Sequence, residues 1–283
     1  MFRKTIKKSI ALEGIGLHRG TPSRVTFLPA PGSSGIRFIS PLFHGPMPAL
    51  TENVCGTARG TNIGDGKNTL YTIEHLLSAA AGLGVDDLDI EISGEEPPAM
   101  DGSALPFAEA LLEAGLTEKP GSERSAGRLT KPVEFSKGET RYRAAPAASE
   151  AVFRLVYDYP HPLVGRQAVE FSLSPEAYLR EIAPARTFAF SHELKALKAA
   201  GLAKGGSLEN AVLIDETEIL AKNGLRFADE FARHKLLDLI GDLALTGLFF
   251  EDLIIEAERP GHAGNINFAK LLSGETIENY SKS

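Results

Sequence analysis

The chain has 283 residues, 43% of them hydrophobic, which is enough to bury the core of one large or two medium domains. Its formal net charge of −7 argues against a general binder of nucleic acid or of an anionic membrane, because both need a basic face on the protein. A single cysteine excludes an internal disulfide, and no segment approaches the roughly 18 apolar residues of a membrane span. We therefore expect a cytoplasmic protein without stable membrane insertion.

Short alternating runs, separated by Pro and Gly, predict strands in the first forty residues, for example at 24–28 and 35–39. The Pro-rich segment 41–50 indicates an irregular excursion, and a strand-like pattern resumes at 54–63. His18 lies between glycines in one of the loops, where a surface or turn residue is the simplest interpretation.

Apolar spacing predicts an amphipathic helix over 69–83, with Thr69 or Thr72 as its N-cap. Glu74 and His75 lie beside the apolar stripe in the first turn. Taken singly, Glu74 is explained as a charge favoured by a helix N-terminus, and His75 as a satisfied polar residue at the edge of the core.

The remaining elements alternate without the Gly-rich turn of a dinucleotide binder or a phosphate-binding loop, which predicts an α+β arrangement in both halves. The polar run 117–131 is the best candidate for a linker. The predicted strands are at 88–92, 133–136, 151–157, 167–172, 211–214 and 252–257, and the predicted helices at 105–116, 175–183, 191–200, 231–248 and 266–272.

The helix at 231–248 has apolar residues around nearly its whole circumference, which predicts that it is buried. At about 100° per residue, His234, Asp238 and Asp242 lie one turn apart on one side. A carboxylate in such a helix is costly to bury unless a cation, a metal or dense hydrogen bonding receives it. Because His at i and Asp at i+4 can hold one metal ion together, a metal is a suitable partner.

Catalytic zinc usually has three protein ligands and an open position for water. His75 is the strongest candidate for the third ligand, because it lies on a buried helix with a carboxylate beside it. Glu74 would then flank the open position. Zinc lowers the pKa of a bound water toward neutrality, so this combination is suited to hydrolysis of an amide or ester.

His262 has small residues on both sides in the predicted loop 258–265, and the simplest interpretation is a surface histidine. The alternative is a general acid whose imidazolium is held by Asp242. Lys235 and Thr187 could donate hydrogen bonds to a developing oxyanion, although singly they would more often be a solvated lysine and a turn threonine.

Six motifs, together with the GLH loop near residue 18, resemble the UDP-3-O-acyl-N-acetylglucosamine deacetylases, the zinc amidases of lipid A biosynthesis in Gram-negative bacteria. They are TIEHLLSA at 72–79, MDGSA at 100–104, ARTFAF at 185–190, GGSLEN at 205–210, RHKLLDLIGD at 233–242 and GHA at 261–263. The likeness covers essentially the whole chain. It departs at Gly264, where the family pattern leads us to expect a larger residue.

The resemblance implies roles for specific residues, with Fe²⁺ possible in place of Zn²⁺ in the cell. It assigns zinc to His75, His234 and Asp238, the general base to Glu74, the general acid or electrostatic partner to His262 with Asp242 behind it, and oxyanion and substrate binding to Thr187 and Lys235. The substrate contacts are expected at Tyr159 for uracil stacking, Arg259 near the diphosphate, Phe188, Ala211 and Val212 along the acyl chain, and His18.

The resemblance also implies two similar α+β domains, at 1–120 and 132–283, joined by a linker at 121–131. In each domain a mostly antiparallel sheet packs on helices, which are sandwiched between the two outer sheets. An insert at about 191–213 is expected to form an apolar passage for the acyl chain. We expect a monomer whose partner is the small UDP-acyl-sugar.

Two other functions fit the two-His, one-Asp set. Non-haem iron oxygenases use the same ligands, but that function gives no role to Glu74 or His262. A binding protein that keeps the metal for stability needs a closed fourth position, and no spare protein ligand is evident for one. Hydrolysis therefore explains more of the residues.

Overall fold

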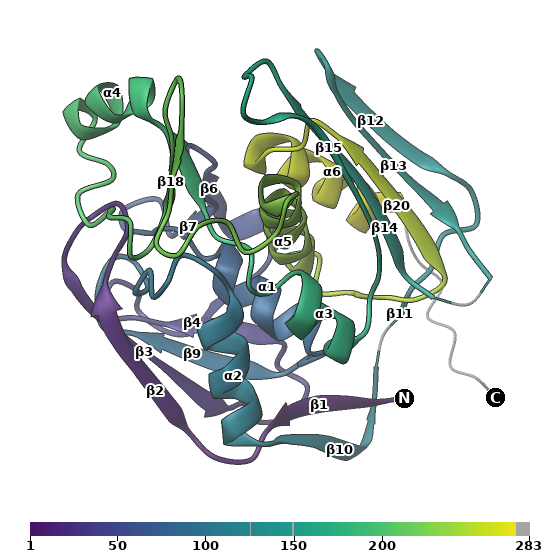
Figure 1. Ribbon diagram of the computed structural model, residues 1–283. Coiled ribbons are helices and arrows are strands. Elements are labelled where there is room, and N and C mark those ends of the chain that lie inside the picture. The colour runs from purple at the N-terminus through teal and green to yellow at the C-terminus, as the bar shows by residue number, and fades with distance from the viewer. Residues whose placement is uncertain (125, 149, 276–283) are drawn as a thin grey trace.

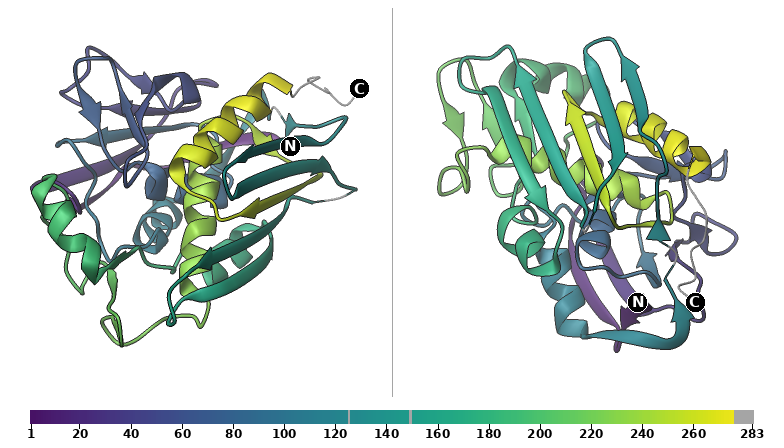
Figure 2. Two further views of the ribbon diagram at one scale, coloured as in Figure 1. Left: turned by 90° about the horizontal axis from the view of Figure 1, so that it is seen from above. Right: turned by 90° about the vertical axis from the view of Figure 1, so that its right-hand side faces the viewer.

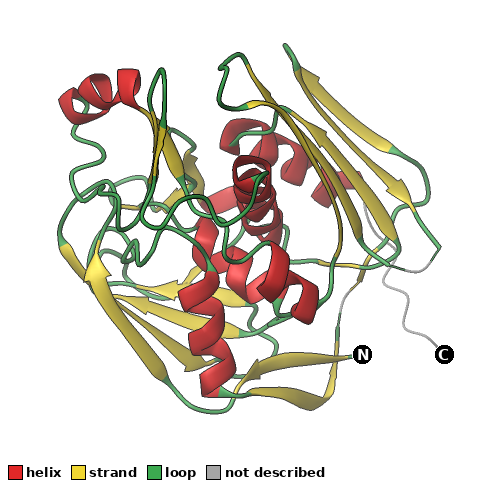
Figure 3. Ribbon diagram, viewed as in Figure 1, coloured by secondary structure: helices red, strands yellow, loops and turns green. Residues whose placement is uncertain are grey.

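The computed structural model describes residues 1–124, 126–148 and 150–275. Most helices occupy the centre of the molecule with a five-stranded sheet on each side of them, whereas the helix at Leu194–Ala199 lies at the outer edge (Figures 1 and 3). This arrangement confirms the predicted α+β class with helices between two outer sheets.

The first sheet has the strand order β2-β3-β9-β4-β5. All neighbours are antiparallel except β4 and β9, which run parallel. Buried residues alternate with more exposed ones along β3, so one face of the sheet packs on the helices. The strands are β2 (Ile10–Ile15), β3 (Pro22–Pro29), β4 (Ile36–Ile39), β5 (Met47–Pro48) and β9 (Leu88–Ile92).

The second sheet has the order β12-β13-β20-β14-β15, seen face on in the right panel of Figure 2. As in the first sheet, two strands that form a hairpin stand at one edge, here β12 and β13. The last strand of the sheet in the sequence, β20, pairs antiparallel with β13 and parallel with β14. The two sheets therefore share one topology. The strands are β12 (Val133–Lys137), β13 (Thr140–Pro146), β14 (Val152–Tyr159), β15 (Gly165–Ser172) and β20 (Leu253–Glu258).

Short strands form four small sheets in the described part of the chain. They pair β1 (Phe2–Ile6) with β10 (Leu116–Glu123), β11 (Ala126–Gly127) with β19 (Phe249–Phe250), β6 (Val54–Gly56) with β7 (Asn62–Gly64) and β8 (Thr69–Leu70), and β16 (Phe188–Phe190) with β17 (Val212–Ile214) and β18 (Ile219–Leu220). Strands β10 and β11 thus occupy part of the predicted linker, whose residue 125 lies outside the described residues, as do residues 149 and 276–283 of the predicted second domain.

Six α-helices are found in the described part of the chain. They are α1 (Glu74–Gly82), α2 (Leu105–Ala114), α3 (Pro175–Glu181), α4 (Leu194–Ala199), α5 (Glu230–Ala244) and α6 (His262–Glu275), and single 3₁₀ turns lie at Thr51–Asn53 and Ser191–Glu193. None of these described helices has the combined length and apolar character that crossing a bilayer requires.

Helices α1 and α5 cross in direct backbone contact at the centre of the molecule. A Cβ atom at Gly241 would collide with the carbonyl oxygen of Glu74, so glycine is required there. This contact brings the first turn of α1 against the middle of α5 and determines which side chains meet.

Three local predictions were wrong. The predicted helix 69–83 begins only at Glu74, and Thr72 is not its cap: the cap position is Ile73, while Thr72 has a φ of 56° and donates its hydroxyl to Glu96. The run 54–63 is two strands around a loop, because β6 turns back to pair with β7. His262 begins α6 and does not lie in a loop.

Candidate metal centre and active site

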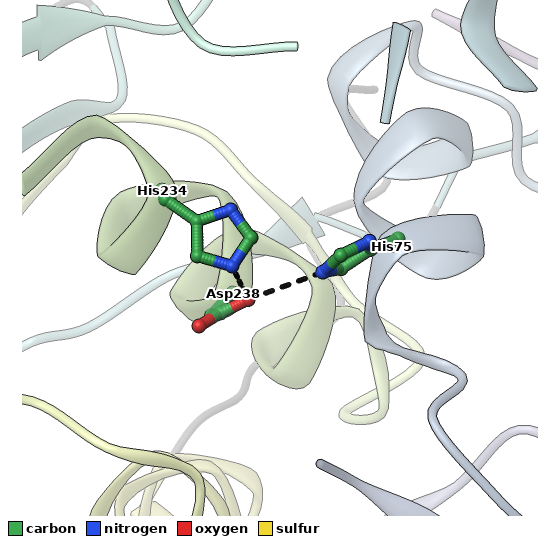
Figure 4. A group of neighbouring side chains, drawn as sticks. All are labelled: His75, His234 and Asp238. Atoms are coloured by element: carbon green, nitrogen blue, oxygen red, sulfur yellow. Dashed lines mark ion pairs between the residues drawn. The ribbon is translucent and has the colours of Figure 1, made fainter. Parts of the chain in front are cut away.

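The predicted ligands come together where α1 meets α5. His75 projects from α1, and His234 and Asp238 project from α5 toward it (Figure 4). The two imidazole rings are 5.1 Å apart between centroids. One oxygen of Asp238, Oδ1, lies 3.4 Å from Nε2 of His234 and 3.7 Å from Nε2 of His75. One ligand atom from each of the three buried residues can therefore face a common point.

The polar atoms of this cluster suit a divalent cation. Asp238 Oδ1 is buried without a hydrogen-bond partner in the described structure, while Oδ2 accepts from Lys235 Nζ at 2.8 Å. His234 Nδ1 lies 3.1 Å from the carbonyl of Ala185, which makes Nδ1 the protonated nitrogen and leaves the Nε2 lone pair free. A cation at the common point would satisfy both free acceptors, so the residues fit a metal.

The protonation states agree with metal binding, which needs neutral imidazoles and an ionised carboxylate. Burial lowers the pKa of His234 to about 3 and also lowers the pKa of His75. Burial alone would raise the pKa of Asp238, but the nearby His234 and Lys235 outweigh it and lower that pKa.

Glu74 lies next to His75 in the sequence and faces the same space. Its carboxylate accepts a hydrogen bond from the backbone N–H of Thr61 at 2.9 Å. Burial raises the pKa of Glu74 to about 7, with Asp238 and Asp242 adding to the effect and His262 opposing it. A carboxyl group with this pKa can accept a proton near neutral pH.

His262 faces the cluster from the start of α6. Its Nε2 lies 3.8 Å from Asp238 Oδ2, and its Nδ1 lies 3.1 Å from Asp242 Oδ2. Burial would lower the pKa of His262, but the carboxylates of Asp242 and Asp238 outweigh it and raise the pKa to about 9. His262 is therefore a cation at neutral pH and can donate a proton.

Sequence reasoning missed the residues that hold Asp242 in place. Asp242 is fully buried and accepts hydrogen bonds from the hydroxyl of Thr61 at 2.5 Å and from Asn265 Nδ2 at 2.8 Å. Asn265 in turn accepts from the hydroxyl of Tyr142 at 2.7 Å, and that hydroxyl also accepts from the N–H of Gly261 at 3.1 Å. Thr61, Asn265 and Tyr142 thereby orient Asp242 and the first residues of α6.

A cavity of about 360 Å³ opens over the cluster. Part of its wall comes from the predicted insert, including Leu194 and Leu197 of α4. The cavity brings together most of the predicted site residues: His18, Glu74, His75, Thr187, Phe188, Ala211, Val212, His234, Lys235, Asp238 and His262.

Two predicted substrate contacts lie outside this lining. The ring of Tyr159 stacks on Phe190 with centroids 4.3 Å apart, and Arg259 makes an ion pair of 2.9 Å with Asp158 and a second one with Glu139. Neither residue belongs to the described wall of the cavity. Their predicted contacts with uracil and diphosphate remain predictions.

Known proteins resemble this chain along most of its length. Residues 3–273 match the family LpxC, UDP-3-O-acyl N-acetylglycosamine deacetylase. Proteins named UDP-3-O-acyl-N-acetylglucosamine deacetylase are similar along most of their length: 41% identity in Anaeromyxobacter dehalogenans, covering 93% of this chain and 84% of the relative, and 42% in Wolinella succinogenes, covering 88% and 83%. The chain therefore belongs to the LpxC family of UDP-3-O-acyl N-acetylglycosamine deacetylases.

Proposed function

We propose that this protein hydrolyses the acetamide of UDP-3-O-(3-hydroxyacyl)-N-acetylglucosamine and releases acetate and UDP-3-O-(3-hydroxyacyl)-glucosamine, as a step of lipid A biosynthesis. The observation that carries the proposal is the placement of Glu74 and His262 beside the cluster of His75, His234 and Asp238 in one cavity. A base of pKa about 7 and an acid of pKa about 9 face the same reacting space.

His75, His234 and Asp238 would hold the metal, which we propose to be Zn²⁺ with Fe²⁺ as an alternative in the cell. Two imidazoles and one carboxylate are a common ligand set for catalytic zinc. When bound there, the ion would supply Lewis acidity and lower the pKa of water.

The residues of the chain then divide the proton transfers between them. Glu74 accepts a proton from the water that attacks the acetamide carbonyl, and His262 donates a proton to the departing amine nitrogen. Asp242 keeps His262 protonated before this step. Thr187 and the ammonium of Lys235 line the cavity, where they can donate hydrogen bonds to the developing oxyanion.

We propose substrate contacts both within the cavity and beyond it. Phe188, Ala211 and Val212 offer apolar wall to the acyl chain. Tyr159 and Arg259 are proposed for uracil and diphosphate, which requires the substrate to extend beyond the cavity. We also propose that the chain is a cytoplasmic monomer of two domains joined at 121–131, and the shared topology of the two large sheets supports the division.

The test is release of acetate from UDP-3-O-acyl-N-acetylglucosamine by the purified protein, with metal counted per chain. We expect activity to fall on chelation and to return with one equivalent of Zn²⁺. Iron dependence with uptake of oxygen would instead favour an oxygenase. Bound metal without release of acetate would favour a metal-stabilised binding protein.

A further inference from the structure

Helix α4 covers the cavity and is held at both of its ends by the first half of the chain. Glu193 directly precedes α4, and its carboxylate forms a bidentate ion pair with Arg59, at 2.8 and 2.9 Å. Ala203 follows α4, and its N–H donates to Nδ1 of His18 at 3.3 Å. Both partners come from loops more than 130 residues earlier in the sequence.

The two attachments are joined to each other. Nε2 of His18 lies 3.0 Å from the carbonyl oxygen of Arg59. Because Nδ1 accepts from Ala203, the proton of the neutral ring is on Nε2, which donates to Arg59. Glu193, Arg59, His18 and Ala203 therefore form one continuous chain of bonds across the cavity edge, and we call these four residues the latch.

The loop that carries His18 is itself firmly held. The buried carboxylate of Glu96 accepts from the N–H of His18 at 3.0 Å and from the N–H of Arg19 at 2.8 Å. After Ala203, the N–H of Lys204 donates to the carbonyl of His18 at 3.2 Å, and the N–H of Gly205 donates to the carbonyl of Leu17 at 3.0 Å. A Cβ at Gly205 would collide with the carbonyl oxygen of Gly16, so this approach requires glycine.

Arg59 links the latch to the reacting groups. It has a φ of 62°, a conformation that a non-glycine residue adopts only where the surroundings hold it. Two residues later, Thr61 donates its N–H to Glu74 and its hydroxyl to Asp242. Arg59 and Thr61 therefore belong to one short loop, which connects the latch to the residue that bonds Glu74 and Asp242.

We propose that the latch holds α4 closed over the cavity and thereby determines how well a long acyl chain binds. In this proposal, which rests on the proposed function, His18 is a positioning residue: both of its ring nitrogens are used within the protein, and its role is to fix the cavity wall. Leu194 and Leu197 of α4 line the cavity between the two attachments, so releasing either end loosens the apolar wall.

The first experiment needs no substrate. Hydrogen exchange is followed in the full chain for Glu193→Gln, which removes the ion pair with Arg59. Its matched control is Glu209→Gln, which removes the ion pair between Glu209 and Lys222. Both residues of that ion pair lie in the second half of the chain, so the control leaves the contacts with the first half in place. We expect residues 194–205 to exchange about two- to fivefold faster in Glu193→Gln only, because a partly exposed ion pair contributes a modest amount of free energy. Equal exchange in the two variants would overturn the latch.

A second pair of variants tests His18. The side-chain oxygen of His18→Asn stands as many bonds from Cβ as Nδ1, so it can still accept from Ala203, whereas His18→Gln places its amide near the position of Nε2. We expect the Ala203 amide to stay protected in the Asn variant and to exchange about tenfold faster in the Gln variant, as the loss of one hydrogen bond predicts. The reverse order would contradict the assigned roles of the two nitrogens.

The third measurement concerns selectivity. We expect Glu193→Gln to raise KM by about two- to fivefold for a long hydroxyacyl substrate and to leave kcat and KM for the butyryl analogue unchanged. Equal effects on both substrates would overturn the link to the acyl chain. If exchange changes as expected but the unmodified protein releases no acetate, the proposed function fails while the latch stands.

Discussion

The hydroxyl of Tyr142 lies 2.5 Å from the point where a Cβ on residue 264 would stand, so Tyr142 fills the space that a side chain at Gly264 would need. The departure from the family pattern at Gly264 thus has a physical explanation. We expect Gly264→Ala to destabilise the protein by about 1–3 kcal/mol in urea unfolding, as other overpacked sites do. Gly274→Ala in the same helix meets no atom within 4 Å and should not destabilise. Equal stability of the two variants would contradict this explanation.

Removal of the Tyr142 hydroxyl should weaken catalysis. Tyr142→Phe deletes the donor to Asn265 and the acceptor for Gly261, so the start of α6 and Asp242 lose part of their support. We expect kcat to fall by about three- to tenfold with unchanged metal content, on the scale of one lost buried hydrogen bond. Tyr178→Phe, which removes a hydroxyl bonded to Ser78 in the core, is the control and should keep its kcat.

Glu74→Ala and His262→Ala should each lower kcat by about two to four orders of magnitude, the usual scale for acid–base groups. Metal content should stay intact in both variants. The exposed residues Glu109 and His44 provide matched alanine controls. Near-normal rates in both variants would contradict the acid–base roles that we propose for Glu74 and His262.

The pH profile should report on Asp242. Activity requires Glu74 ionised and His262 protonated, so kcat/KM rises with pH through the pKa of Glu74 and falls through that of His262. A bound cation lowers both pKa values. In the metal-bound enzyme we therefore expect the acid limb of the profile at or below pH about 7 and the alkaline limb at or below pH about 9. Because Asp242 raises the pKa of His262, Asp242→Asn should move the alkaline limb to lower pH. An unmoved limb would show that another group governs it.

The metal-free protein should lose stability as pH rises from about 6.5 to about 9. The pKa of His262 is about 9 in the folded chain against 6.5 ordinarily, so its stabilisation is complete below 6.5 and is lost as pH rises through 9. The loss is up to about 3 kcal/mol, from 1.36 kcal/mol per pKa unit. Urea unfolding in chelator at several pH values checks this. His262→Gln should flatten the dependence, and an equal slope in the variant would contradict the assignment.

The cluster of His75, His234 and Asp238 could be predicted from the sequence because local periodicity contains most of the information. A carboxylate inside an apolar helix needs a partner, and His234 one turn before Asp238 favours a metal as that partner. His75, the third proposed ligand, was predicted from its own buried helix. That prediction did not require knowing that α1 packs on α5. It required only the expectation that buried polar groups lie close to one another.

Other features could not be predicted, for physical reasons. Strand β13 was missed because the alternation of apolar and polar residues is weak in its sequence. The small Ala144 is one of its inward residues, and Arg141 and Arg143 point outward. The hydrogen bonds from Tyr142 to Asn265 and from Thr61 to Asp242 join residues 123 and 181 positions apart, and no periodicity encodes such contacts. The helical start at His262 was hidden by the glycines on either side of it.

The backbone contact between Gly241 and Glu74 limits how the enzyme can open. Since the two helices that carry His75 and His234 touch without intervening side chains, rotating one half of the chain away from the other like a hinge would dismantle the buried core. We therefore expect a ligand to enter and leave by displacement of peripheral segments, while α1 and α5 stay packed against each other.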